Sequence, residues 1–241
     1  MMRPEGADDA CTRAPKAHAG AEWAWMKQEN LDIHLYQKLQ TLMQEDGLVL
    51  DATMERLMAR HLEVLRAWQP VASLVSKRDL ADLWTRHVAD SLSLTLLVRR
   101  FASGGLGTLL DIGSGGGFPA LPVKVVLPGL RVCLVERSER KVGFLCKLVR
   151  TLGLSDVSVV HGEFPVAAAG VVAEVMTARA VERPTRLLTA FTERIAAGTV
   201  FLCQNEATAE QLAGRFHVEQ VLDGWTAAGL RRGGLWVVRQ S

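Results

Sequence analysis

The clearest candidate for a functional motif in this sequence is an apolar segment that ends in an acid and is followed by a glycine loop. It reads Leu109-Leu110-Asp111-Ile112-Gly113-Ser114-Gly115-Gly116-Gly117-Phe118-Pro119. A strand, a tight glycine turn and a helix N-terminus in this order build the nucleotide-binding corner of a doubly wound sheet. A dinucleotide would place its pyrophosphate on this loop, where Asp111 would repel it. The acid instead suits a ligand with an ammonium group, such as S-adenosylmethionine (SAM).

A second acid lies one strand–helix–strand unit downstream. Glu136 ends the apolar run Arg131–Glu136 and follows Asp111 by 25 residues. A carboxylate at this position can accept hydrogen bonds from both ribose hydroxyls of an adenosine. The two acids and the glycine loop together predict a SAM site. The alternatives are an ordinary strand–helix turn with a surface acid, and a dinucleotide site.

The composition indicates an ordinary globular protein in a reducing setting. The chain has 241 residues, of which 49% are hydrophobic and 22% charged, and a formal net charge of +2. This mild charge is compatible with a nucleic-acid partner but does not prove one. The cysteines are scattered, without metal-site spacing, and no apolar segment matches a membrane span or a secretory signal. We therefore expect a cytoplasmic protein without disulfides, a bound metal or a membrane.

The N-terminal part of the chain shows a helical pattern. Apolar side chains recur at helical spacing over residues 28–101, which predicts three helices. Asp51 is expected to cap the second of these helices, Pro70 to end it and Asp79 to begin the third. We divide the chain into a flexible tail, a helical extension and a SAM-dependent α/β domain, covering residues 1–22, 23–104 and 105–241.

From residue 107 onward, strand and helix patterns alternate. The predicted strands are 108–112, 131–136, 157–161, 172–177 and 199–204, and the predicted helices are 119–127, 139–152 and 184–196. Segments 217–221 and 235–239 are expected to form a terminal hairpin. This alternation predicts an α/β fold with a doubly wound, mostly parallel sheet, the Rossmann-like fold of class I SAM-dependent methyltransferases.

Four further motifs carry a resemblance to a known family. They are Arg86-His87-Val88-Ala89-Asp90-Ser91, Phe118-Pro119-Ala120-Leu121-Pro122, Arg140-Lys141-Val142-Gly143-Phe144-Leu145 and Ala178-Arg179-Ala180. On these motifs, over roughly residues 28–205, the chain resembles the bacterial small-subunit ribosomal RNA guanine-N7 methyltransferases of the GidB type. The resemblance implies methyl transfer from SAM to N7 of a guanine in 16S ribosomal RNA, with the RNA or the small ribosomal subunit as partner.

The resemblance also implies roles for individual residues. Arg86, His87, Asp90 and Ser91 would lie on one helix near the cofactor. Arg179 and His87 are the candidates for the reaction site, with a structural ion pair and a structural histidine as the alternatives. Arg86, Arg140 and Lys141 are the candidates for RNA contacts, and a solvated helix face is the alternative for Arg140 and Lys141. The cofactor site would be formed by Asp111, Gly113, Ser114, Gly115, Gly117, Phe118, Glu136, Glu163, Phe164, Pro165 and Arg179.

Guanine N7 has a free lone pair, so its methylation needs no strong general base and can depend on positioning and electrostatics. This agrees with a sequence that lacks a nucleophile–base pair. After the predicted fourth strand, the chain also lacks the Asn/Asp-Pro-Pro-aromatic motif of enzymes that methylate exocyclic amines. Arg179 stands there instead, and a guanidinium can hold a phosphate or a guanine edge.

The chain departs from the family pattern at four positions near the expected site. Ser73 and Val75 replace an asparagine and a threonine, Pro165 replaces a glutamate in the adenine turn, and Gln204 replaces a lysine. The cofactor core is kept, whereas positions expected near the acceptor are partly changed. Two alternatives therefore stay open: a relative that methylates a small molecule or a peptide, and a SAM-binding protein that is not an enzyme.

Overall fold

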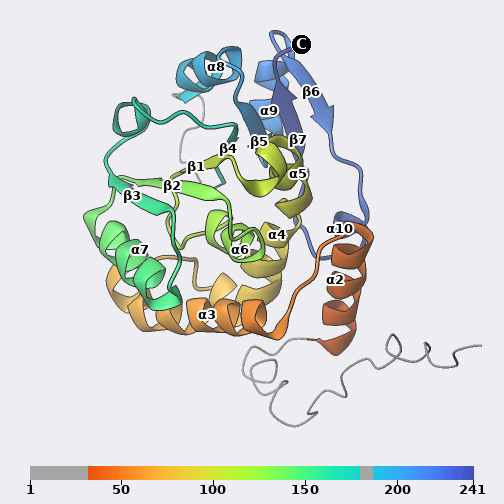
Figure 1. The fold of residues 1–241 in the computed structure, drawn as a ribbon, viewed down its shortest axis with the longest axis vertical. Coiled ribbons are helices and arrows are strands. Elements are labelled where there is room, and N and C mark those ends of the chain that lie inside the picture. The colour runs from red at the N-terminus through yellow and green to blue at the C-terminus, as the bar shows by residue number, and fades with distance from the viewer. Residues whose placement is uncertain (1–31, 180–186) are drawn as a thin grey trace, which may run out of the picture.

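A seven-stranded sheet forms the centre of the structure, a computed structural model that describes residues 32–179 and 187–241 (Figure 1). The predicted tail, residues 1–22, lies outside the described residues. The strands are β1 (Thr108–Ile112), β2 (Arg131–Glu136), β3 (Val157–His161), β4 (Val175–Thr177), β5 (Val200–Cys203), β6 (His217–Gln220) and β7 (Trp236–Arg239).

The strand order is β3-β2-β1-β4-β5-β7-β6. Strands β1 to β5 pair in parallel, and β7 joins β5 and β6 in antiparallel fashion. The chain builds outward from β1 to β3 and then returns to place β4 on the other side of β1. The order therefore reverses between β1 and β4, which is where doubly wound sheets bind their ligands. The predicted fold class is confirmed.

Helices cover both faces of this sheet (Figure 1). They are α2 (Ile33–Glu45), α3 (Ala52–Ala72), α4 (Asp90–Leu92), α5 (Thr95–Phe101), α6 (Ala120–Val126), α7 (Glu139–Leu152), α8 (Leu188–Ala196), α9 (Glu206–Ala213) and α10 (Gly224–Ala227). Neighbouring strand residues point to opposite faces: Leu109 packs with α2 to α7 in one hydrophobic cluster, and Leu110 packs with α8 and α9 in another. None of the described helices is long and apolar enough to cross a bilayer.

Several local predictions are confirmed by the structure. β1, β2, β3 and α7 have the predicted bounds. Asp51 caps α3, since its Oδ1 accepts hydrogen bonds from the backbone N–H groups of Thr53 (2.7 Å) and Met54 (2.8 Å). α8 begins at Leu188, and the preceding part of its predicted range, residues 184–186, lies outside the described residues.

The prediction that Pro70 ends the second helix is wrong. The helix continues to Ala72, because Pro70 removes its own N–H bond but leaves the next turn intact. The N–H of Ser73 still donates to the carbonyl of Gln69 at 3.0 Å. Ser73, in the left-handed conformation (φ 48°), then ends the helix.

The third predicted helix is broken into short pieces. A 3₁₀ turn (Asp79–Ala81) leads to a π-helix (Trp84–Ala89), which is followed by α4 and α5. Buried side chains fall on all sides of this segment, so a single straight helix with one apolar stripe would leave some of them exposed. The π turn shifts the register just before Asp90, and such turns are frequent at functional sites.

The C-terminal half differs from prediction in detail. The fourth and fifth strands are shorter than expected, Val175–Thr177 and Val200–Cys203, because ladder pairing with their neighbours is limited to these residues. Strands β6 and β7 pair as the expected hairpin, but α10 lies between them. The helix α9 was not predicted.

Candidate active site

Asp111, the acid at the end of β1, lies at the point where the strand order reverses. It is 1% exposed and its Oδ1 accepts a hydrogen bond from Thr177 Oγ1, on β4, at 2.8 Å. Its Oδ2 is buried without a hydrogen-bond partner. Burial raises the pKa of Asp111 to about 6, and the Thr177 bond opposes that rise. The carboxylate thus keeps a free acceptor oxygen beneath the glycine loop.

The glycine loop after β1 requires its glycines. Gly113, Gly115 and Gly117 have φ angles of 71°, 49° and 84°, a region that side chains with a Cβ rarely enter. A Cβ on Gly117 would also lie 2.8 Å from Leu121 Cδ1. The loop therefore turns tightly and leaves its backbone open to a ligand.

The second acid is tied to this loop. Glu136 is 5% exposed, and its Oε2 accepts a hydrogen bond from the N–H of Gly115 at 3.0 Å. Its Oε1 accepts one from the N–H of Ser138 at 2.8 Å. Each oxygen keeps a further lone pair, so the carboxylate can still accept hydrogen bonds from a ligand.

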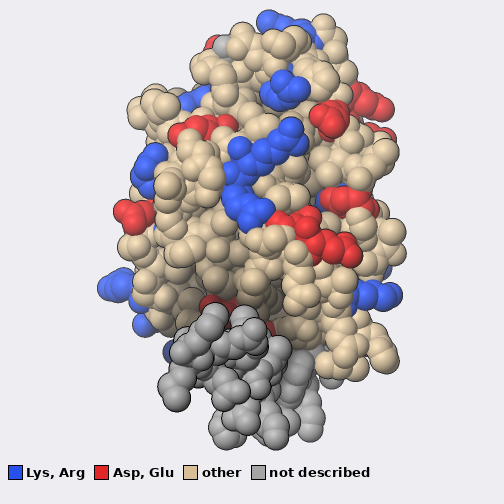
Figure 2. Space-filling view, turned by 45° about the vertical axis from the view of Figure 1, so that its right-hand side comes forward, with Lys and Arg blue, Asp and Glu red and all other residues tan. Residues whose placement is uncertain are grey.

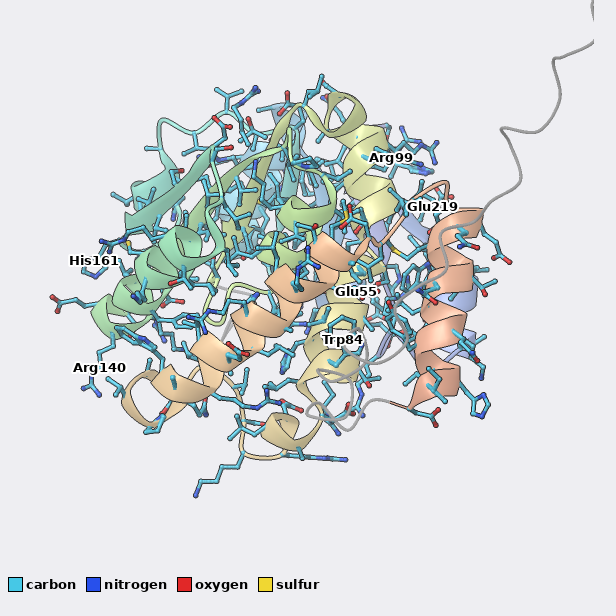
Figure 3. The ribbon with its side chains drawn as sticks, turned by 60° about the horizontal axis from the view of Figure 1, so that its bottom comes forward. Glu55, Trp84, Arg99, Arg140, His161 and Glu219 are labelled. Carbon is cyan, nitrogen blue, oxygen red and sulfur yellow. The ribbon has the colours of Figure 1, made fainter. Side chains whose placement is uncertain are left out.

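A cavity of about 790 Å³ opens beside the loop, a volume typical of small-molecule sites. It brings together ten of the predicted site residues: His87, Gly113, Ser114, Gly115, Phe118, Glu136, Lys141, Glu163, Phe164 and Arg179. Five others do not line it: Arg86, Asp111, Gly117, Arg140 and Pro165. Arg140 is exposed and projects from the start of α7 at the edge of the molecule (Figure 3).

Sequence reasoning missed one wall of the cavity. This wall consists of Leu74, Ser76 and Asp79, together with Ser73 and Val75, which had been noted only as departures from the family pattern. These residues follow α3, whose predicted end at Pro70 was wrong. The left-handed cap at Ser73 turns the chain toward the glycine loop. The sequence around Ser73 gives no signal that this segment and the loop meet.

Arg179 and His87 lie together at one end of the cavity. Arg179 Nη2 donates to His87 Nδ1 at 2.6 Å, so the proton of the neutral imidazole is on Nε2. Burial lowers the pKa of His87 to about 3, and repulsion from Arg179 adds to this shift. His87 is therefore neutral at physiological pH, and its Nε2 lies 3.8 Å from Asp79 Oδ2.

Arg86 is engaged on the same wall. It forms a close ion pair with Asp79 and lies 3.7 Å from Asp82 Oδ2. Burial raises the pKa of Asp79, but the hydrogen bonds from Ser76 and Arg86 and the nearby positive charge together outweigh this effect, and the net pKa is lowered. The structure thus places Arg86 behind Asp79 rather than on the cavity wall.

A buried aromatic stack connects helix α3 to the loop. His61, on α3, donates from Nε2 to the carbonyl of Gly116 at 2.7 Å and stacks on Phe118 with ring centroids 4.5 Å apart. His87 stacks on Phe118 with centroids 5.0 Å apart, and Arg179 Cζ lies 5.5 Å from the centroid of the same ring. His61 was not predicted as a site residue, because its helical spacing reads as an ordinary core position.

The described cysteines are free thiols away from the cavity wall. Cys133 and Cys203 are buried, and Cys146 is exposed. Burial raises the pKa of Cys203 to about 11, which makes its thiol unreactive. Among the described residues, no three His, Cys, Asp or Glu side chains are grouped so that they could hold a metal ion.

The chain matches a known protein family over most of its length. The family model described as rRNA small subunit methyltransferase G (GidB) matches residues 54–224, more than half of the chain. The chain belongs to this family. A relative from Staphylococcus epidermidis, named ribosomal RNA small subunit methyltransferase G, is 32% identical over 172 residues, covering 70% of this chain and 71% of the relative. A Sorangium cellulosum relative of the same name is 34% identical over 171 residues, covering 69% of this chain and 71% of the relative.

Solved structures share the fold of this family member at low sequence identity. A methyltransferase from Geobacter sulfurreducens is 17% identical, with a TM-score of 0.51 over 74% of this chain and 89% of that chain. MtNAS, solved in complex with MTA and tNA, is 17% identical, with a TM-score of 0.52 over 90% of this chain and 81% of that chain. At this identity the likeness supports the fold alone.

Proposed function

We propose that this protein transfers a methyl group from SAM to N7 of a guanine in the 16S ribosomal RNA of the small subunit, in the cytoplasm. Membership of the rRNA small subunit methyltransferase G family supports the acceptor. One structural observation carries the proposal: a single cavity joins the glycine loop and Glu136 to the pair formed by Arg179 and His87. A methyl donor and an acceptor base can therefore meet in one cavity.

The residues around the loop fit SAM. The buried, unpartnered Oδ2 of Asp111 is an acceptor for the ammonium of the methionine end, directly or through water. The lone pairs that Glu136 keeps suit the ribose hydroxyls, and Glu163 and Phe164 line the wall where the adenine would lie. When bound, SAM supplies an electrophilic methyl group on a sulfonium.

The side chains at the other end suit an acceptor that needs no deprotonation. The lone pair of guanine N7 attacks directly, so the site has to hold the base in line and exclude water. The guanidinium of Arg179 can donate to guanine O6 or to a phosphate. His87 is neutral, so its Nδ1 can accept a hydrogen bond from Arg179 and help to hold the guanidinium in place.

The test is transfer of label from methyl-labelled SAM to 16S RNA and to 30S particles from a strain that lacks its own enzyme of this type. We expect label at one guanine, mapped by chemical cleavage at N7-methylguanine. Absence of label, from protein shown by calorimetry to bind SAM, would contradict the ribosomal acceptor. Methylation of a small molecule or a peptide would then identify a divergent methyltransferase. If no acceptor is methylated, the protein binds SAM without being an enzyme.

A further inference from the structure

Asp90 is a buried carboxylate at the meeting point of four chain segments. It follows the π-helix Trp84–Ala89 and is 4% exposed. Its Oδ2 accepts hydrogen bonds from Arg179 Nη1 at 3.0 Å, just after β4, and from Gln204 Nε2 at 3.3 Å, just after β5. Its Oδ1 accepts one from the backbone N–H of Arg232, in the loop before β7, at 3.2 Å.

Asp90 lies behind the cavity wall, whereas its partner Arg179 forms part of that wall. The guanidinium is held on three sides: by Asp90, by His87 Nδ1 and by the ring of Phe118. A long arginine side chain loses rotamer entropy when it is fixed in one place. Asp90 is the charged partner among these three contacts.

Of the three groups that donate hydrogen bonds to Asp90, only the Arg179 guanidinium is charged. Gln204 offers a neutral amide to Asp90 where the family pattern has a lysine, and Arg232 offers its backbone N–H. Arg179 thus neutralises Asp90 in the buried pair, with side-chain exposures of 19% and 6%. Loss of either partner would leave the other charge in a poorly solvated place.

We propose that Asp90 is a positioning residue for methyl transfer, which acts by fixing the guanidinium of Arg179 against His87 and Phe118. This inference rests on the proposed function, since it assigns Arg179 to the acceptor end of the cavity. Asp90 does not touch the acceptor itself. Through Gln204 and Arg232, the end of β5 and the C-terminal loop hold Asp90 in turn.

The experiment compares Asp90→Asn with the wild-type protein. Asparagine has nearly the same shape but no charge, so we expect kcat for 16S RNA to fall about 10- to 100-fold. Affinity for S-adenosylhomocysteine, measured by calorimetry, should fall less than kcat, because the hydrogen bonds of Asp90 go to Arg179, Gln204 and Arg232 and not to the glycine loop or Glu136. In an Arg179→Ala background, Asp90→Asn should cause little further loss, since the two residues act as one unit.

A matched control is Asp223→Asn. Asp223 holds the buried Arg231 through bonds of 2.7 and 2.8 Å, away from the cavity wall. This variant should lower the melting temperature without lowering kcat. Normal kcat in folded Asp90→Asn would overturn the proposal, as would a full, additive loss in the Arg179→Ala background.

A second readout does not depend on the acceptor. The guanidinium ¹⁵N–¹H signals of Arg179 should be sharp in the wild type and broadened in Asp90→Asn, and unchanged in Asp223→Asn. Unchanged Arg179 signals in Asp90→Asn would overturn the proposal, whereas a wild-type protein without activity on RNA would contradict only the proposed function. If Asp90→Asn does not fold, Gln204→Leu takes its place, because it removes one hydrogen bond to Asp90. This variant should lower kcat about fivefold. An unchanged kcat in Gln204→Leu would overturn the proposal.

Discussion

Asp111 is a buried carboxylate that destabilises the folded protein and is at the same time suited to bind a cation. Its folded-state pKa is raised from 3.8 to about 6, mainly by burial. Above pH 6 the ligand-free protein therefore holds an unfavourable carboxylate with one oxygen unpaired. A cationic group placed beside that oxygen would remove the penalty. The burial that makes this carboxylate unfavourable without a partner thus also suits it to bind an ammonium.

Replacement of this residue should separate stability from binding. At pH 7.5 we expect Asp111→Asn to stabilise the ligand-free protein by about 1–3 kcal/mol, because a raised acid pKa costs stability above that pKa. The same change should weaken SAM binding at least about tenfold, since the ammonium loses its charged partner. Urea unfolding and calorimetry measure the two effects.

The pH dependence provides the control for this prediction. If the ammonium of SAM binds the ionised Asp111 carboxylate as proposed, wild-type affinity should fall as the pH drops through about 6. The affinity of Asp111→Asn should be much flatter over the same range. Equal slopes in the two proteins would show that another group titrates on binding.

At the scale of elements, helix α3 supports the glycine loop from outside the sheet. His61 is 2% exposed, and burial lowers its pKa to about 4, so it is neutral when it donates to the Gly116 carbonyl. Leu65, one turn further along α3, would lie 3.4 Å from a Cβ on Gly116. The helix thus packs directly against the loop that shapes the cavity.

We expect His61→Phe to weaken SAM binding about fivefold, because phenylalanine keeps the stack on Phe118 but leaves the Gly116 carbonyl without its buried donor. His61→Gln keeps a donor at similar reach and should recover much of this loss. Calorimetric titration measures both, with His34→Phe, an exposed position, as control. If His61→Phe binds SAM as tightly as the wild-type protein, the hydrogen bond from α3 to the Gly116 carbonyl does not contribute to SAM binding.

At the scale of the whole molecule, the face drawn in Figure 2 carries both signs of charge among the described residues. Figure 2 shows Lys and Arg side chains interspersed with Asp and Glu side chains on the face turned toward the viewer. The cationic side chains Arg137 and Lys141 do line the cavity, and Arg140 is exposed beside them. We therefore expect RNA to make few phosphate contacts, concentrated near the cavity mouth.

The double variant Arg140→Gln/Lys141→Gln should bind 16S RNA with a smaller salt dependence. Each lost phosphate contact reduces the slope of log K against log salt by about 0.7–0.9. Arg239→Gln is the control. Arg239 is exposed at the C-terminal end of β7, which runs antiparallel to β5 and so lies beside the start of β5, away from the cavity. Equal slopes for the double variant and the wild type would show that these side chains do not contact phosphate.

The sequence by itself determined the features that depend on neighbouring residues. The bounds of β1, β2, β3 and α7 and the cap at Asp51 follow from periodicity and capping over a few residues, and the structure has them. The acid, glycine loop and second acid follow in the same way, because strand–helix–strand spacing fixes where their side chains meet.

Only the tertiary structure decided how distant segments converge. The breaks between residues 79 and 101, the passage of α3 beyond Pro70 and the short β4 depend on what packs against each segment. The contacts of Asp90 with Arg179 and Gln204, and of His61 with Gly116, join residues 89, 114 and 55 positions apart. No local pattern encodes such pairs, because their free energy comes from burial and charge in the folded interior.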